Sequence, residues 1–277
     1  MEDSFQFLSD SKTEKQRYLN HLKPLIGSYS ISLITPIKLE TIKIDLLAKG
    51  LAPQTVMHII SLVKRTYNLL INWELFKNNP ASKLKISLPD NRRNRYLTKN
   101  EANILLDTLK EKSIPTWRMS LLSLSTGMRA GEIFNIKGVH VDLNRKTLKI
   151  VDTKSNRNRI VYIPGAALKM LSELSLSKNN LIFCSKFGGK INSISKTFPR
   201  IVDELGFNDG ITDNRDKVVF HTLRHTFASW LIQSGETLHV VGELLGHSTL
   251  EMTKRYAHLT PEIKQAATTT INSYIDL

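Results

Sequence analysis

Apolar residues recur at helical spacing through the first third of the chain, most clearly after Pro53. The apolar positions there follow the i, i+3, i+4, i+7 steps of an amphipathic helix. They are Val56, Ile59, Ile60, Val63, Tyr67, Leu70 and Ile71. Two similar segments come earlier, one at 13–26 and one that Thr35 caps and Gly50 closes. Residues 1–86 therefore predict a small, all-helical domain.

A second domain is predicted to begin at the capping box of residues 98–101, which opens another apolar stripe of helical period. From Val139 the apolar period changes to two, and polar residues 144–146 make a turn between two strands. Apolar residues 160–163 add a third strand after a polar, basic hairpin tip. We therefore expect a mainly α fold with a small antiparallel β-sheet, in which residues 98–277 form the larger domain.

Three more helices are predicted toward the C-terminus, and they carry most of the reactive side chains. Residues 221–232 form the first helix and residues 238–245 the second, and a glycine follows each of them. A third helix, capped by Ser248 or Thr249, carries Tyr256. Two helices and a turn would thus bring their polar residues to one edge.

The composition adds a strong positive charge to this picture. The chain has 39 Lys and Arg against 25 Asp and Glu, which gives a net charge of +14 and a pI of about 9.8. This surplus favours a polyanionic partner, either nucleic acid or an anionic membrane. No run of 18 apolar residues predicts a transmembrane helix, and the first residues do not resemble a signal peptide. The single Cys184 excludes an intramolecular disulfide, so we expect a reducing, cytoplasmic setting.

Residues 87–97 separate the two predicted domains and show no apolar periodicity, so we interpret them as a basic linker. Basic side chains here and on the polar face of the clearest helix are candidates for contacts with DNA phosphates. They are Arg92, Arg93 and Arg95 in the linker and Lys64 and Arg65 on the helix. A solvated surface without a partner explains the same residues about equally well.

Two imidazoles, a guanidinium and a phenol are predicted to converge at one edge of the C-terminal helices, from His221, His247, Arg224 and Tyr256. Each residue alone is usually a turn, core or surface residue, so the case rests on their convergence. Their spacing is not that of a zinc-binding helix, and no metal site is predicted. A guanidinium with imidazoles suits a phosphate oxyanion, and a phenol beside them suits a nucleophile.

Two further candidates lie earlier in the second domain. Arg129 stands between Gly127 and Gly131, where the backbone is expected to turn sharply. Glu132, three residues on, could pair with Arg129 and hold its guanidinium for a bidentate contact. Lys154 opens the polar hairpin tip. Without the remaining set, each of these would be interpreted as a surface residue.

Taken together, these motifs resemble the tyrosine recombinase (phage integrase) family. The resemblance is carried by TGMRAGEI around Arg129, by Lys154 in a hairpin, by HTLRHTFAS from His221, by LLGHS around His247 and by RYAH around Tyr256. The order and spacing match over roughly residues 96–260. The helical N-terminal domain is similar to the core-binding domain of that family, so the resemblance implies a DNA-binding domain followed by a catalytic domain.

The resemblance also implies a reaction. Tyr256 would attack a DNA phosphodiester, form a 3′-phosphotyrosyl link and release a 5′-hydroxyl. Arg129 and Arg224 would clamp the non-bridging oxygens, where negative charge grows in the transition state. Because the covalent link keeps the bond energy, neither ATP nor a metal nor any other cofactor is expected.

The remaining predicted site residues would transfer protons, bind the phosphate or hold Arg129. The resemblance assigns Lys154 to protonation of the leaving 5′-oxygen and His221 to proton transfer at the tyrosine. His247 would hydrogen-bond the phosphate, and Glu132 would hold Arg129 in place.

An assembly on double-stranded DNA follows from the same resemblance. Four protomers would exchange strands in pairs through a Holliday junction, with accessory DNA-bending proteins in some systems. The tail 261–277 would dock into a neighbouring protomer, or else pack on its own domain. About a dozen residues precede the first predicted helix, so we expect either the simpler subgroup without an arm-binding domain or a truncated chain.

The expected activity is site-specific recombination, with integration or excision of a mobile element as the first role. A Xer-like resolvase of DNA dimers has the same catalytic residues and remains an alternative. A non-catalytic DNA-binding protein of this fold would not need the complete catalytic set. A type IB topoisomerase fits the compact layout less well. A membrane-surface protein is disfavoured because the charge is not gathered on one amphipathic helix.

Overall fold

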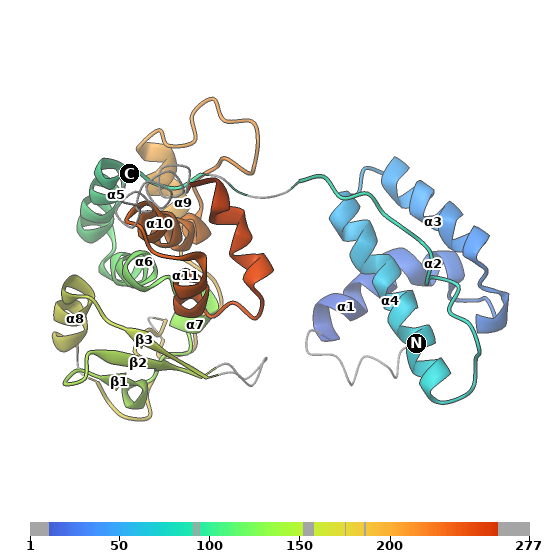
Figure 1. Ribbon diagram of the computed structural model, residues 1–277, viewed down its shortest axis with the longest axis horizontal. Helices are drawn as coiled ribbons and strands as arrows, with labels where there is room; N and C mark the ends of the chain where they lie inside the picture. Colours follow the sequence, from blue (N-terminus) through green and yellow to red (C-terminus); the bar gives the residue numbers. More distant parts are fainter. Residues whose placement is uncertain are drawn as a thin grey trace, which may run out of the picture. The chain divides into compact units, whose positions relative to one another are not determined.

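The computed structural model describes residues 11–90, 93, 95–151, 158–174, 176–185 and 187–259. The chain divides into two compact units, unit 1 at Met1–Asn91 and unit 2 at Arg92–Leu277. The described part of unit 1 is helical, and that of unit 2 combines helices with a three-stranded sheet (Figure 1). The predicted fold class, mainly α with a small antiparallel sheet, is confirmed.

Unit 1 consists of helices that begin at favourable residues. Its described elements are α1 (Ser11–Arg17), the π-helical η2 (Tyr18–Leu22), α2 (Lys23–Ile26), the 3₁₀ turn η3 (Ile31–Leu33), α3 (Pro36–Ala48) and α4 (Pro53–Asn72). Both α3 and α4 begin with proline, whose fixed φ suits the first helical position. The predicted cap is present, since the Thr35 hydroxyl accepts a hydrogen bond from the Lys38 amide at 3.2 Å. The apolar stripe of α4 is buried in the core of this unit, with Ile59 and Val63 fully enclosed.

Unit 2 has a helical body with the sheet beside it (Figure 1). Its described helices are α5 (Lys99–Lys112), α6 (Ile114–Thr126), α7 (Ala130–Ile133), α8 (Gly165–Ser172), α9 (Thr197–Glu204), α10 (Phe220–Gln233) and α11 (Leu238–Leu245), with 3₁₀ turns η4 (Gly138–His140), η5 (Leu250–Met252) and η6 (Lys254–Leu259). The predicted capping box opens α5: the Thr98 hydroxyl accepts from the Glu101 amide, and the Glu101 carboxylate accepts from the Thr98 amide. Helix α6 packs against α5, α7, α8 and α10.

The sheet consists of β1 (Val141–Asp142), β2 (Thr147–Ile150) and β3 (Arg159–Tyr162), paired antiparallel in that order. Leu148 lies opposite Val161, and both side chains are buried in the main core. Ile160 and Tyr162, on the alternate positions of β3, are exposed. The period of two in the sequence therefore reflects one buried face and one open face.

The predicted third helix of the C-terminal stretch is wrong in type. The chain makes two 3₁₀ turns there, closed by hydrogen bonds from the Thr253 amide to Leu250 O (2.8 Å) and from the Tyr256 amide to Thr253 O (3.0 Å). Residues three apart lie on the same side of a 3₁₀ turn. Thr253 and Tyr256, three apart, are both buried.

Helix α10 packs against α6, α11 and η6, so it connects the body of unit 2 with the segment that carries Tyr256. The hairpin tip with Lys154 and the tail 261–277 lie outside the described residues. Across the residues described, no helix is both long and apolar enough to span a bilayer.

Candidate active site

Two left-handed glycines shape the loops on which the candidate residues stand. Gly127 (φ 68°) ends α6, and Arg129 follows it. Gly246 (φ 67°) ends α11, and His247 follows it. A side chain at Gly127 would also place its Cβ 2.5 Å from Cδ1 of Phe227, so this turn demands glycine for conformation and for space.

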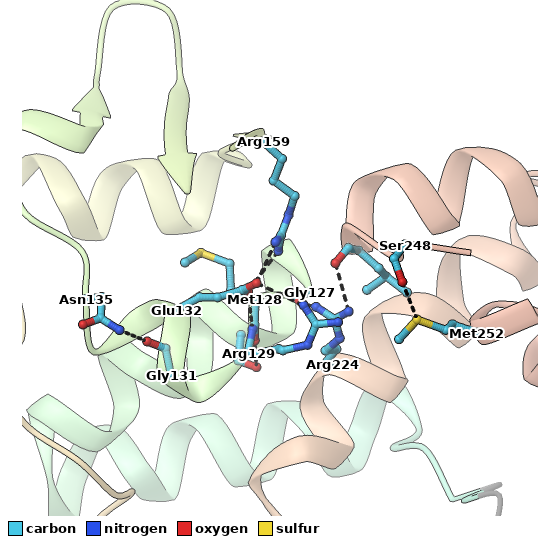
Figure 2. A network of polar contacts seen from close by, with 12 residues as sticks. Gly127, Met128, Arg129, Gly131, Glu132, Asn135, Arg159, Arg224, Ser248 and Met252 are labelled. Atoms are coloured by element: carbon cyan, nitrogen blue, oxygen red, sulfur yellow. Dashed lines mark hydrogen bonds and ion pairs between the residues drawn. The ribbon is translucent and has the colours of Figure 1, made fainter. Parts of the chain in front are cut away.

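Arg224 ties these two loops together. Its side chain is buried, with 3% of the residue exposed. Nη1 donates to Gly127 O at 2.6 Å, and Nη2 donates to Leu245 O at 2.9 Å (Figure 2). Burial, followed by the nearby charge of Arg129, lowers the pKa of Arg224 to about 9, so the guanidinium remains charged at neutral pH. A fixed cation therefore stands where the two loops meet.

Glu132 holds two arginines at once (Figure 2). Its carboxylate accepts from Nη1 of Arg129 at 3.1 Å and from the Arg129 amide at 2.7 Å. It also accepts two hydrogen bonds from Arg159, at 2.6 and 2.9 Å. Burial alone would raise the pKa of Glu132, but the hydrogen bonds and charge of Arg159 lower it overall. The carboxylate is therefore ionised, and it holds Arg129 through one guanidinium nitrogen and the backbone amide.

The imidazoles of His221 and His247 are kept neutral by this electropositive environment. The pKa of each is lowered to about 4, first by loss of water around the ring and then by the charges of Arg224 and Arg129. His247 Nδ1 shares a hydrogen bond of 2.7 Å with the hydroxyl of the buried Thr253. A bound anion would offset the arginine charges and make both imidazoles more basic.

Tyr256 lies in the same region on η6 and is buried, with 4% exposed. Its hydroxyl lies 2.7 Å from Nδ1 of His225. Burial raises the pKa of Tyr256, and the positive charges of Arg224 and Arg255 partly counter that rise. The phenol is therefore protonated at rest, close to a fixed guanidinium.

The structure brings together five of the six predicted catalytic residues: Arg129, His221, Arg224, His247 and Tyr256. Lys154 lies outside the described residues. The five residues that the structure brings together form an anion site with a phenol at its edge, because cations and neutral imidazoles stabilise a phosphate oxyanion. Within the described ranges, no three His, Cys, Asp or Glu side chains gather to hold a metal ion.

The candidate DNA-contact residues have different surroundings. Arg93 donates to Lys217 O at 3.1 Å and lies near enough to His221 to lower its pKa. Arg95 is engaged in a two-point ion pair with Glu101. In unit 1, Lys64 is exposed, and Arg65 pairs with Glu14 at 2.5 Å. Arg92 lies outside the described residues.

Sequence reasoning missed the roles of three residues that the structure places in this site. Arg159 pairs with Glu132, His225 contacts the Tyr256 hydroxyl, and Arg255 lowers the pKa of Tyr256. For His225 a signal was available, because it lies four residues after His221 and so shares its helix face. The partner of Arg159 is 27 residues away, and no local pattern indicates it.

Comparisons with known proteins agree on one family. The model of the phage integrase family matches residues 95–262. The integrase of Salmonella phage P22 is 31% identical over 68% of this chain and 49% of its own length. Tyrosine recombinase XerC of Thermodesulfovibrio yellowstonii is 29% identical over 90% of this chain and 87% of its own length. The chain belongs to the phage integrase family of tyrosine-type recombinases, enzymes that cleave and rejoin DNA.

Solved structures show the same fold. The integrase of the Tn1549 transposon, in complex with transposon right-end DNA, matches with a TM-score of 0.76 and 16% identity, over 98% of this chain and 97% of that one. A lambda integrase dimer bound to a core site matches with a TM-score of 0.71 and 17% identity, over 91% and 93%. Both matches span the two units, so the order of a helical unit and a mixed unit is that of known integrases.

Proposed function

We propose that this protein is a site-specific DNA recombinase in which Tyr256 attacks a DNA phosphodiester and forms a 3′-phosphotyrosyl intermediate. The observation that carries the proposal is the buried Arg224, held between two loops and beside the Tyr256 phenol. A fixed cation next to a phenol suits a reaction in which a phenolic oxygen adds to a phosphate. Family membership supports the same chemistry.

Arg129 and Arg224 would bind the non-bridging phosphate oxygens. Their positions are fixed before DNA arrives, Arg129 by Glu132 and Arg224 by two backbone carbonyls. Such preorganised donors need no reorganisation as charge develops on the phosphate. The net effect is stronger stabilisation of the transition state than of the bound diester.

The proton transfers would be divided among the remaining residues. Lys154 would protonate the 5′-oxygen that leaves, and His247 would donate a hydrogen bond to the phosphate. His221 would assist proton transfer near the tyrosine. The opposite reaction, attack of a 5′-hydroxyl on the phosphotyrosine, uses the same groups in reverse. Neither ATP nor a metal enters these steps.

The partner would be double-stranded DNA, contacted by a helical DNA-binding domain at 1–86 and by a catalytic domain at 98–277, with the linker 87–97 joining the two. A net charge of +14 supports binding to a polyanion. Lys64, Arg65 and the linker arginines would contribute phosphate contacts, with Arg95 the weakest candidate because Glu101 already holds it. A homotetramer with exchanged 261–277 tails, aided by DNA-bending proteins, would complete the strand exchange through a Holliday junction.

Integration and excision of a mobile element is the role we favour. The phage P22 integrase and the Tn1549 transposon integrase are among the similar proteins, and both belong to mobile elements by name. A Xer-like resolvase of DNA dimers is the second candidate. The XerC match over 90% of the chain favours that role and leaves the same chemistry in place.

Covalent trapping tests the proposed chemistry. The protein is incubated in EDTA with a tiled DNA library from its own genetic neighbourhood, denatured, and the attached DNA is sequenced. We expect links through a 3′-phosphate at a few discrete positions, lost in Tyr256→Phe and retained in Tyr162→Phe, whose ring is exposed on β3. Binding to DNA should stay nearly unchanged in Tyr256→Phe. DNA binding without any Tyr256-dependent adduct would favour a non-catalytic DNA-binding protein instead.

A further inference from the structure

The phenol of Tyr256 has a specific partner that the proposed reaction has not yet used. Its Oη lies 2.7 Å from Nδ1 of His225, a short distance for a hydrogen bond to nitrogen. Both residues are nearly closed to solvent, with 4% and 3% exposed. Within the part of the chain that the structure describes, the Tyr256 hydroxyl makes no other hydrogen bond.

We propose that His225 is a further catalytic residue, which accepts the phenolic proton of Tyr256 as Oη attacks the phosphorus. This rests on the proposed function, because it assigns a step within that reaction. Nδ1 of His225 contacts the reacting oxygen itself. The His221 ring meets the His225 ring edge to face, with centroids 4.7 Å apart.

The charges around His225 favour its neutral form, which can accept a proton. Groups that face it from its own helix are His221 and Arg224, and from η6 Arg255 and Tyr256. Burial, and then the neighbouring His221, Arg255 and Arg224, lower the pKa of His225 to about 3 in the DNA-free protein. Arg93, before α5, acts in the same direction. The ring is therefore neutral at rest, and a phenol O–H is a better donor to a bare imidazole nitrogen than the reverse.

Bound DNA changes this balance at the moment it is needed. A phosphodiester between Arg129 and Arg224 brings one negative charge, and a second develops as Oη adds to phosphorus. Both charges oppose the cations around His225 and raise its affinity for a proton. Bound DNA thus makes His225 a stronger base, whereas His225 is a weak base in the free protein.

The Oη–P bond forms and the P–O5′ bond breaks, while the phenolic proton moves to Nδ1 of His225 and the leaving 5′-oxygen receives a proton from Lys154. In rejoining, a 5′-hydroxyl gives its proton to Lys154 and displaces Oη, and the His225 imidazolium returns its proton to the departing phenolate. One imidazole therefore serves as base in cleavage and as acid in religation.

The test compares cleavage by the full-length wild type, His225→Asn and Tyr256→Phe. Asparagine keeps a polar atom near the place of Nδ1 and cannot take up a proton at these pH values. The substrate is a nicked duplex that contains a cleavage position found by covalent trapping. At the cleaved phosphodiester, sulfur replaces the bridging 5′-oxygen, so that departure of the leaving group needs no acid. His239→Asn, on an exposed face of α11, is the matched control.

We expect His225→Asn to slow adduct formation about 100-fold at pH 7. Between pH 6 and 8 the wild type should be nearly flat, whereas the variant should gain about tenfold per pH unit, because solvent must then remove the proton. Equal loss at every pH would make His225 a positioning residue only and overturn the proposed proton transfer. Unchanged rate and slope would overturn it as well.

Two further outcomes separate the remaining possibilities. If wild-type protein forms no adduct that depends on Tyr256, the proposed function fails, and this proposal fails with it. If His225→Asn does not fold, nitrogen NMR of the wild-type ring decides. A proton on Nε2 and none on Nδ1 supports the accepting role, whereas a protonated Nδ1 overturns it.

Discussion

Replacing Glu132 with glutamine keeps the shape of the side chain and removes the charge that two arginines share. Arg159 then retains a guanidinium that is 15% exposed and whose Nε already has no hydrogen-bond partner among the described residues. Arg129 loses the same counter-charge, but its side chain is 37% exposed and water can compensate. Most of the lost folding stability therefore comes from the unpaired charge of Arg159.

The size of that cost follows from the burial of the pair. Removing one partner of a buried ion pair typically destabilises a protein by about 3–5 kcal/mol. For a domain of about 150–250 residues this corresponds to a loss in Tm of roughly 6–20 °C. The pKa of Glu132 is lower in the folded protein than its ordinary value of 4.5, so its stabilisation is present above pH 4.5 and is lost as pH falls through the folded-state pKa.

Chemical denaturation of wild type, Glu132→Gln, Arg159→Met and the double variant measures this coupling. The double variant should cost less than the sum of the two single variants, by at least about 1.5 kcal/mol, because the second substitution removes the charge that the first left unpaired. Glu204→Gln is the control, since its pair with Lys112 is half exposed and spans 4.0 Å. It should stay within about 0.5 kcal/mol of wild type.

Additive single-variant costs would refute the reasoning, because they would mean that Glu132 and Arg159 contribute independently. A difference between wild type and Glu132→Gln that stays constant from pH 7 to pH 3 would refute the pH argument. In that case the carboxylate would not be the group that titrates.

Two other predictions concern the same region. Gly246→Ala should destabilise unit 2 by about 1–3 kcal/mol, since φ is positive and the new Cβ would meet Arg159 Cδ at 2.7 Å. Gly210→Ala is the control, because Gly210 has φ 70° and open space around it, and it should destabilise the protein clearly less. Equal losses of stability would remove the steric argument. His221, His225 and His247 have pKa values of about 4, 3 and 4, below the ordinary 6.5, so their neutral forms stabilise the fold above pH 6.5 and this contribution is lost as pH falls toward 4. Unfolding near pH 5 should therefore take up about three protons, measured as the slope of unfolding free energy against pH, and stability unchanged between pH 7 and 5 would contradict it.

Local signals predicted the helices well, because caps and prolines act over three or four residues. The Thr35 cap and the capping box at Thr98 formed as expected, and the period of two around Leu148 marked the sheet. The glycines near Arg129 and His247 also indicated the loops of the site. In each case the deciding interaction lies within one turn or one strand pair.

Contacts between distant segments were beyond the reach of such patterns. The hydrogen bond between Arg159 and Glu132 and the one between Tyr256 and His225 join residues 27 and 31 positions apart. The 3₁₀ turns around Tyr256 likewise result from burial against α10 and α11 rather than from local helix preference. Capping residues indicated a helix start there, and tertiary packing selected a tighter helix.

Further hydrogen bonds tie helix α10, which carries Arg224, to residues 96 and 97. The Thr226 hydroxyl accepts from the Leu97 amide at 2.9 Å, and the Trp230 indole donates to Leu97 O at 3.1 Å. Gln233 donates to the Tyr96 hydroxyl at 2.9 Å. The segment that enters unit 2 is therefore anchored on the helix that carries Arg224, so tension along this segment would be passed directly to that helix.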